Sequence, residues 1–265
     1  MTDVDCDAAC ASVRGYIGAR MSDDLPVKGK GVCGIVNLDN LHGESENMHR
    51  GTHWIAFHGN NVMDPLGSLN LPPPELITFM RKHGHKRPNI NTKIVQPIDS
   101  GICGHMSCAY LLMRDAGVSH KEIMDTMNDQ ELIGSGLYQK VANFVGKTVN
   151  PKEHSPMFSD ETHIPNFNFC GPGTRLKERL ERGDKPVNAT DEVCMQHDKD
   201  YSTSKTPQDK RRADEKALAA WLALRGKSNT RGSELVTKVF QSKRLLEDKA
   251  PKVARWLLGS NFASG

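Results

Sequence analysis

The chain has 265 residues, and its hydrophobic content of 37% is ordinary for a globular protein, which argues against a wholly disordered chain. Such a length can form one large domain or two small ones, each with its own core. The formal net charge is +3, yet residues 205–255 hold 14 Lys and Arg against 6 Asp and Glu. We expect this basic region to attract an acidic partner, nucleic acid or anionic lipid, unless it is a solvated helical face.

The seven cysteines are irregularly spaced, so they do not indicate a disulfide framework, and an odd count leaves at least one without an intramolecular partner. We therefore expect synthesis in a reducing compartment. The acidic start, residues 1–10, lacks the pattern of a secretion signal. No apolar run approaches the roughly 20 residues that span a bilayer. The sequence thus predicts neither a signal peptide nor a transmembrane segment.

The first half has the pattern of a mixed α and β structure. Alternation of apolar and polar residues predicts short strands, and Pro or capping residues mark the starts of helices. We expect strands at residues 52–57, 61–64 and 93–96, and helices at residues 72–81 and 102–113.

The second half is mostly helical in its pattern, after a polar, Pro-containing linker. Residues 132–149 form an amphipathic segment, which either packs on a domain or lies on a membrane surface. Further helices are expected at residues 191–204 and 208–224. The predicted organisation is an α+β domain at 1–128, an amphipathic helix and linker at 129–163, a helical domain at 164–250 and a tail at 251–265.

A set of residues in the first half has the chemistry of a thiol protease. Cys103 lies in the first turn of an expected helix, where the helix dipole and free amides stabilise a thiolate. Such a nucleophile needs a base and an orienting group, which His53 and Asp64 can supply. The Gln96 amide and the Cys103 backbone N–H can hold an oxyanion. Each residue singly has an ordinary structural explanation, and their order and sequence context decide between the two.

These residues lie in segments that closely resemble the adenovirus protease (adenain) family of cysteine endopeptidases. The segments are residues 33–37, 53–57, 64–67, Gln96 and residues 103–104. The resemblance implies a papain-like domain with a mixed sheet plus helices and four catalytic residues, namely His53, Asp64, Gln96 and Cys103. SUMO-specific proteases belong to the same clan, so a deubiquitinating or deSUMOylating enzyme is an alternative. DNA or a peptide is the implied activator, although no Cys between Cys33 and Cys103 could link a peptide by disulfide.

A second set of residues has the chemistry of metal-assisted ester hydrolysis. His197 and Asp198 lie on one expected helix, which can aim a general base and a metal-binding carboxylate into the same cleft. The loop at 169–174 can present backbone carbonyls to a hard cation such as calcium. Asp214, on the next expected helix, can hold the imidazole in its productive tautomer. His197 can then deprotonate a water for attack on an ester.

Zinc is the alternative metal for the same segment. Cys194 and His197 have the spacing of zinc ligands, and Cys170 and His163 can complete a four-ligand site. In that alternative the second half is a non-catalytic zinc- or membrane-binding structural module of a virion, beside an active protease.

Several segments of the second half resemble the phospholipase A2 domain of parvovirus minor capsid proteins. They are residues 169–173, 185–188, Asp191, and residues 197–201, 213–214 and 239–243. The resemblance implies that His197 and Asp214 are catalytic. It also implies a calcium site made by the carbonyls of Phe169, Gly171 and Gly173 with the Asp198 carboxylate. Like those viral domains, this one is expected to lack a disulfide framework.

Together the two resemblances predict a viral bifunctional hydrolase. A thiol endopeptidase processes viral precursor proteins, and a calcium-dependent phospholipase A2 hydrolyses the sn-2 ester of phospholipid membranes during entry. The expected locations are the virion and the host cell, at the endosomal membrane on entry and in the nucleus or cytoplasm on assembly. Adenovirus-type proteases prefer Met, Ile or Leu, then any residue, Gly and any residue, and they cleave before a following Gly. Residues 132–136 fit this pattern and are rich in small, permissive glycines, so self-cleavage between Ser135 and Gly136 is also expected.

Overall fold

The chain divides into two units, residues 1–151 and 152–265, which are described separately. The computed structural model describes residues 1–26, 32–38, 53–67, 72–85, 87–96, 101–149, 164, 166–171 and 174–258, with only the backbone at 146–149. Within these residues, no helix is both long and apolar enough to cross a membrane.

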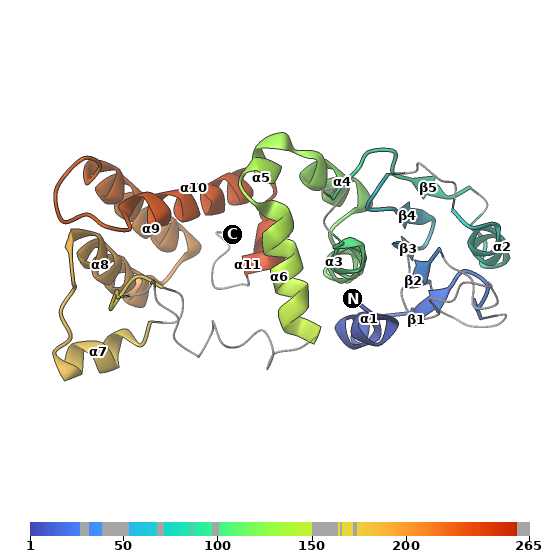
Figure 1. Cartoon of the computed structure of the whole chain (residues 1–265), viewed down its shortest axis with the longest axis horizontal. Helices are drawn as coiled ribbons and strands as arrows, with labels where there is room; N and C mark the ends of the chain where they lie inside the picture. Colours follow the sequence, from blue (N-terminus) through green and yellow to red (C-terminus); the bar gives the residue numbers. More distant parts are fainter. Residues whose placement is uncertain are drawn as a thin grey trace. The chain divides into compact units, whose positions relative to one another are not determined.

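The first unit is built on a five-stranded mixed sheet (Figure 1). Its strands, in spatial order, are β1 (Tyr16–Met21), β2 (Cys33–Asn37), β3 (Trp54–His58), β4 (Asn61–Met63) and β5 (Asn89–Ile90). The two outer pairs are parallel and the two inner pairs antiparallel. The helices are α1 (Asp3–Cys10), α2 (Pro74–Lys82), α3 (Cys103–Asp115), α4 (His120–Asn128), α5 (Gln130–Gly134) and α6 (Leu137–Val149). The expected α+β class is confirmed.

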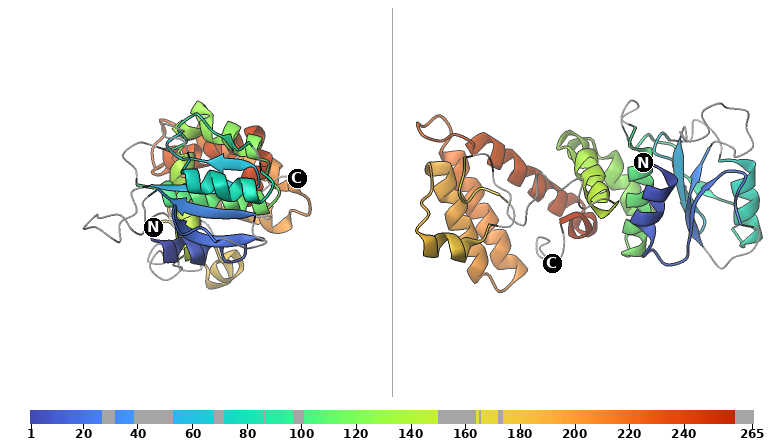
Figure 2. Two further views of the ribbon diagram at one scale, coloured as in Figure 1. Left: turned by 90° about the vertical axis from the view of Figure 1, so that its right-hand side faces the viewer. Right: turned by 60° about the horizontal axis from the view of Figure 1, so that its bottom comes forward.

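Helices cover both faces of this sheet, with α2 on one face and α3 with α1 on the other (Figure 2). As a result β2 is buried along its whole length, and β3 is buried at every position but its last. Ile55, Phe57 and Leu76 belong to the core between the sheet and α2. A strand covered on both faces is expected to be apolar throughout. This explains the apolar run at residues 54–57 of β3.

Two expected elements of the first unit differ from the structure. Residues 93–96 are not a strand; Val95 makes one backbone hydrogen bond, to Pro65, and β5 forms at residues 89–90 instead. The amphipathic segment 132–149 is two helices, because Gly136 adopts a left-handed conformation (φ +84°) between α5 and α6.

The helix α6 packs on α1 and α3 within the first unit, with Val141 and Val145 fully buried. This arrangement matches the first of the two alternatives for the amphipathic segment, packing on a domain. The expected cleavage bond, Ser135–Gly136, lies at the junction of α5 and α6, and Leu132 on its N-terminal side is 1% exposed. Self-cleavage stays a prediction, and it requires α5 to unfold so that the segment can enter a protease cleft extended.

The second unit is helical. Its helices are α7 (Leu176–Arg182), α8 (Ala189–Thr203), α9 (Pro207–Ala223), α10 (Ser233–Lys249) and α11 (Pro251–Leu258). The expectations of helices at 191–204 and 208–224 are confirmed within two residues. Local capping explains the two starts: the Asn188 side chain accepts the Asp191 N–H, and Thr206 forms a capping box with Asp209.

The core of the second unit lies between the loop before α7 and the helices α8, α9 and α10. Phe169 and Trp221 are each 1% exposed, and they pack with Phe167, Ala217 and Val236 in one cluster. This core positions the loop at 166–171 directly against α8, which carries His197.

Candidate active sites

The first candidate site begins with a buried histidine–aspartate pair. Nε2 of His53 lies 2.6 Å from Oδ1 of Asp64, and the two residues are 9% and 6% exposed. His53 precedes β3 and Asp64 follows β4. The antiparallel pairing of these strands turns the chain back on itself and brings the two residues together. The structure thus places the expected base beside its expected orienting group.

Cys103 is the first residue of α3, as expected from the sequence. Burial raises the pKa of the Cys103 thiol, but the hydrogen bonds from His53 and from the backbone of Trp54 and Gly104 outweigh it and lower that pKa. Burial lowers the pKa of His53, whereas hydrogen bonds with Asp64 and Cys103 raise it to about 9. Because Nε2 of His53 faces Asp64, Nδ1 is the nitrogen left for Cys103. Both shifts favour a thiolate–imidazolium pair at neutral pH.

Asp64 is held by its own loop and by Asn91, which the sequence did not single out. The Leu66 N–H donates to Asp64 Oδ1 over 2.8 Å. The Asn91 amide accepts the Asp64 backbone N–H and donates to the Asp64 carbonyl, each over 2.7 Å. The Asn91 amide bonds the backbone of Asp64 as a neighbouring strand would. Such a contact leaves no periodic pattern in the sequence, so the sequence could not have identified Asn91.

Gln96 is buried, at 5% exposure, in the segment that runs beside the loop after β4. The Val95 N–H donates to the Pro65 carbonyl over 2.8 Å. Gly67 permits this close approach, because its φ is +66° and a Cβ there would lie 2.9 Å from the backbone of residues 92–93. Within the described residues Gln96 Oε1 has no hydrogen-bond partner. Its role as an oxyanion donor stays a prediction.

The second candidate site centres on His197 in α8. Its Nε2 lies 2.9 Å from Oδ1 of Asp214 on α9, and its Nδ1 lies 3.6 Å from Oδ1 of Asp198. Asp214 is 2% exposed and accepts at Nε2, so the neutral ring carries its proton on Nε2 and its lone pair on Nδ1. Burial lowers the pKa of His197, but hydrogen bonds with Asp198 and Asp214 raise it overall. The ring packs edge-on against Phe240, with centroids 5.1 Å apart.

Asp214 accepts hydrogen bonds from two further side chains. The Tyr201 hydroxyl donates to Oδ1 over 2.7 Å, and the Lys243 ammonium on α10 donates to Oδ2. The sequence assigned no role to Lys243, which appeared only as the last residue of a resembling segment. Its spacing from Glu247 could have indicated an i,i+4 ion pair, but not that Asp214 is the third member.

Two of the expected calcium ligands converge in the loop before α7. The Thr174 hydroxyl lies within hydrogen-bond distance of the Phe169 carbonyl oxygen, at 3.2 Å, and of the Gly171 carbonyl oxygen, at 3.1 Å, so both carbonyls face this one hydroxyl. Asp198 Oδ2 is buried and has no hydrogen-bond partner within the described residues, which is costly for a carboxylate oxygen that binds no cation. These oxygen donors fit calcium. The remaining expected ligand, Gly173, lies outside the described residues.

A fully buried carboxylate organises this loop. Asp191 is 0% exposed, and its Oδ1 accepts the N–H groups of Phe169 and Cys170 at 2.8 and 3.0 Å. Its Oδ2 accepts the N–H groups of Asn168 and Val187 at 3.0 and 3.1 Å. In the sequence Asp191 stood only as part of the resemblance, with no role. Four backbone donors on one carboxylate orient the carbonyls of the same loop away from it.

Cys170 and Cys194 form a disulfide that joins the loop to α8. The sequence predicted no disulfide framework, and the structure has this one disulfide within the described residues. The bond also contradicts the zinc alternative, because it uses two of the four proposed ligands, and a third, His163, lies outside the described residues. The sulfurs lie close to Asp191, but its carboxylate is occupied by backbone donors. The pairing escaped the sequence because the two cysteines are 24 residues apart and meet only when the loop packs on α8.

Reduction of this disulfide is expected to destabilise the second unit. A loop of this size predicts a loss of about 2–4 kcal/mol in the free energy of unfolding. The measurement is calorimetric unfolding of the full chain with and without dithiothreitol. The control is the Cys170→Ala/Cys194→Ala variant, whose second-unit transition should not respond to the reductant. An unchanged wild-type transition under full reduction would contradict the prediction.

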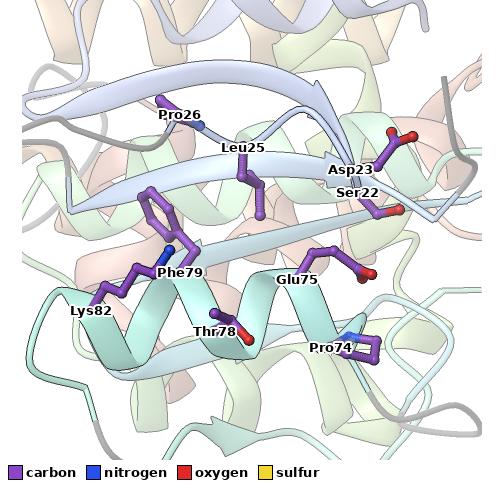
Figure 3. Close-up of a pocket in the computed structure, with 9 residues that line it drawn as sticks. All are labelled: Ser22, Asp23, Leu25, Pro26, Pro74, Glu75, Thr78, Phe79 and Lys82. Carbon is purple, nitrogen blue, oxygen red and sulfur yellow. The ribbon is translucent and has the colours of Figure 1, made fainter. Parts of the chain in front are cut away.

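A cavity of about 310 Å³ lies elsewhere in the first unit, between α2 and the segment that follows β1 (Figure 3). It is lined by Ser22, Asp23, Leu25, Pro26, Pro74, Glu75, Thr78, Phe79 and Lys82. None of these residues is a catalytic candidate, so we assign the cavity no part in either site.

Comparison with known proteins supports the second site. Residues 160–243 match the family model of the phospholipase A2-like domain. The matched span contains the loop, His197, Asp198, Asp214 and Lys243. No curated protein and no solved structure matches the chain. The match covers less than half of the chain, and it supports a hydrolase in the second unit. Phospholipase A2-like domains are typically calcium-dependent.

Proposed function

We propose that the second unit is a calcium-dependent phospholipase A2 that hydrolyses the sn-2 ester of phospholipids. The observation that carries the proposal is the position of His197 between two carboxylates, Asp214 at Nε2 and Asp198 on the Nδ1 side, within the matched span. Nδ1 accepts a proton from water as the water attacks the ester carbonyl, while Asp214 stabilises the imidazolium that forms. The proton then passes to the leaving alcohol, so that the products are a fatty acid and a lysophospholipid.

The cation site is formed by oxygens of this chain. The carbonyls of Phe169 and Gly171 and the Asp198 carboxylate would hold the ion, with Gly173 as the fourth residue that the resemblance implies. Bound there, calcium supplies Lewis acidity that stabilises the developing oxyanion of the ester. Asp191 keeps the loop carbonyls in place.

Calcium dependence is expected to be measurable on the full chain carrying Cys103→Ala, which removes the proposed protease activity. Fatty acid release from phosphatidylcholine vesicles should stop with a chelator and return with calcium. Asp198→Asn should weaken calcium binding at least about tenfold, because it removes a charged ligand. Titration calorimetry measures the affinity.

Asp200→Asn is the matched control for Asp198→Asn. It also lies on α8, but its carboxylate is bonded to Lys216 over 2.7 Å, so calcium affinity should stay near the wild-type value. Recovery of the chelated protein by zinc and not by calcium, or equal effects of the two variants, would contradict the proposed site.

We also propose that the first unit is a thiol endopeptidase. The supporting observation is that Cys103, His53 and Asp64 lie together in the order thiol, imidazole, carboxylate. The Cys103 thiolate attacks a peptide carbonyl, His53 donates its proton to the leaving amine, and water then releases the acyl group from sulfur. The resemblance to the adenovirus protease suggests viral precursor proteins as substrates, and a virus as the source of both activities.

A further inference from the structure

Lys243 is a largely buried cation at the second site. Its side chain is 11% exposed, and it contacts oxygens on three helices. The ammonium donates to Asp214 Oδ2 on α9, lies 3.1 Å from the Tyr201 hydroxyl on α8, and lies 3.4 Å from Glu247 Oε1 on its own helix α10. The contacts with Asp214 and Tyr201 are hydrogen bonds, and the contact with Glu247 is an ion pair.

Burial of a lysine ammonium costs free energy unless the charge is paired and hydrogen-bonded. A solvent-exposed lysine would avoid that cost, and α10 has one in Lys238. Packing alone does not require a charge at this position. The arrangement is therefore better explained by what the ammonium does to the carboxylate that it contacts.

The two oxygens of Asp214 have separate partners. Oδ1 accepts from Nε2 of His197 and from Tyr201, whereas Oδ2 accepts from Lys243. The ammonium thus fixes the carboxylate plane and compensates its charge. Without it, a carboxylate that is 2% exposed would rotate or take up a proton. A carboxyl group that donates to Nε2 would move the ring proton of His197 to Nδ1, the nitrogen that must accept a proton from water.

We propose that Lys243 is a positioning residue of the second site, which acts through Asp214 to keep the ring proton of His197 on Nε2 and the Nδ1 lone pair available. Glu247 holds the ammonium in place from the next turn of α10. The proposal rests on the proposed phospholipase function for its catalytic consequence, but the tautomer that it specifies can be observed without any turnover.

The kinetic test uses the full chain with Cys103→Ala and micellar phosphatidylcholine. Lys243→Met should lower kcat about 10²-fold, less than the about 10⁴-fold loss known for a triad histidine held in the wrong tautomer. KM should stay within about twofold and calcium affinity should be unchanged, if Lys243 acts only through its contacts with Asp214, Tyr201 and Glu247. Lys238→Met, the same substitution at an exposed position of α10, should have wild-type kcat.

Two further variants keep the test valid if Lys243→Met folds poorly. Lys243→Arg retains the cation and should recover most of the lost kcat. Asp214→Asn/Lys243→Met removes both charges of the Lys243–Asp214 pair, and it should be no slower than Asp214→Asn alone, because Lys243 acts only through that carboxylate. Additive losses in the double variant would overturn the proposal.

The structural readout is the tautomer of His197, from long-range ¹H–¹⁵N spectra of histidine-labelled protein at a pH where the ring is neutral. His197→Gln assigns the signal. The wild type and Lys238→Met should show the proton on Nε2, and Lys243→Met should show it on Nδ1 or shared. An Nε2 proton in all three would overturn the proposal. Absence of wild-type hydrolysis with calcium would instead reject the phospholipase function, and the spectra would still decide the role of Lys243.

Discussion

Replacement of His197 by alanine is expected to abolish phospholipid hydrolysis, with kcat falling by about 10⁴-fold, the upper range for loss of a general base. We expect no other side chain to take over the proton at this position, because Asp198 is assigned to the proposed cation site and Asp214 already accepts hydrogen bonds from three donors. Calcium binding should persist, since the loop carbonyls and Asp198 are untouched. Fatty acid release and titration calorimetry measure the two effects separately.

The neighbouring residue offers the control for this substitution. Gln196 lies on the exposed side of α8 and donates to Asp200 over 2.8 Å. Gln196→Ala should keep both hydrolysis and calcium binding. If His197→Ala retained turnover within about tenfold of the wild type, His197 would not be the general base.

Replacement of Cys103 by alanine is expected to remove peptide cleavage by the first unit. A loss of about 10⁶-fold is the scale seen when the nucleophile of a catalytic triad is removed. The fold should survive, because alanine fills most of the space of a cysteine. The start of α3 also has no side-chain capping hydrogen bond that the substitution could remove. Cleavage of peptides with Met, Ile or Leu two residues before Gly measures the activity, and circular dichroism checks the fold. Wild-type cleavage by the variant would contradict the assignment.

The same site has an expected pH dependence. The pKa of His53 is raised to about 9, so the imidazolium is present below that pH and is lost as pH rises through it. Peptide cleavage should therefore fall above a pH of about 9, where no proton remains for the leaving amine. It should also fall in acid, where the Cys103 thiolate takes up a proton; the lowered pKa of Cys103 moves that limit downward.

Labelling of Cys103 by a ubiquitin- or SUMO-based probe would favour the deconjugating alternative.

Local features of both sites could be predicted from the sequence. The position of Cys103 at the start of a helix, and of His197 with Asp198 inside one, follow from capping residues and from the spacing of apolar residues over a few turns. Such signals depend on neighbours in the chain. The expected strand at residues 93–96 shows their limit, because an extended segment that lacks a partner strand has the same pattern as a strand.

Pairings between distant residues were decided only by the tertiary structure. Cys170 meets Cys194, Asn91 meets Asp64, and Lys243 meets Asp214 across 24, 27 and 29 residues. Each contact depends on how two elements pack, and helix packing angles are set by the whole core. The sequence by itself therefore determined which chemical groups each element carries: a thiol, two histidines, several carboxylates and a glycine loop. The packing decided which of these groups face one another. A charged group needs a specific partner only once it is buried, and it becomes buried only when the elements pack together.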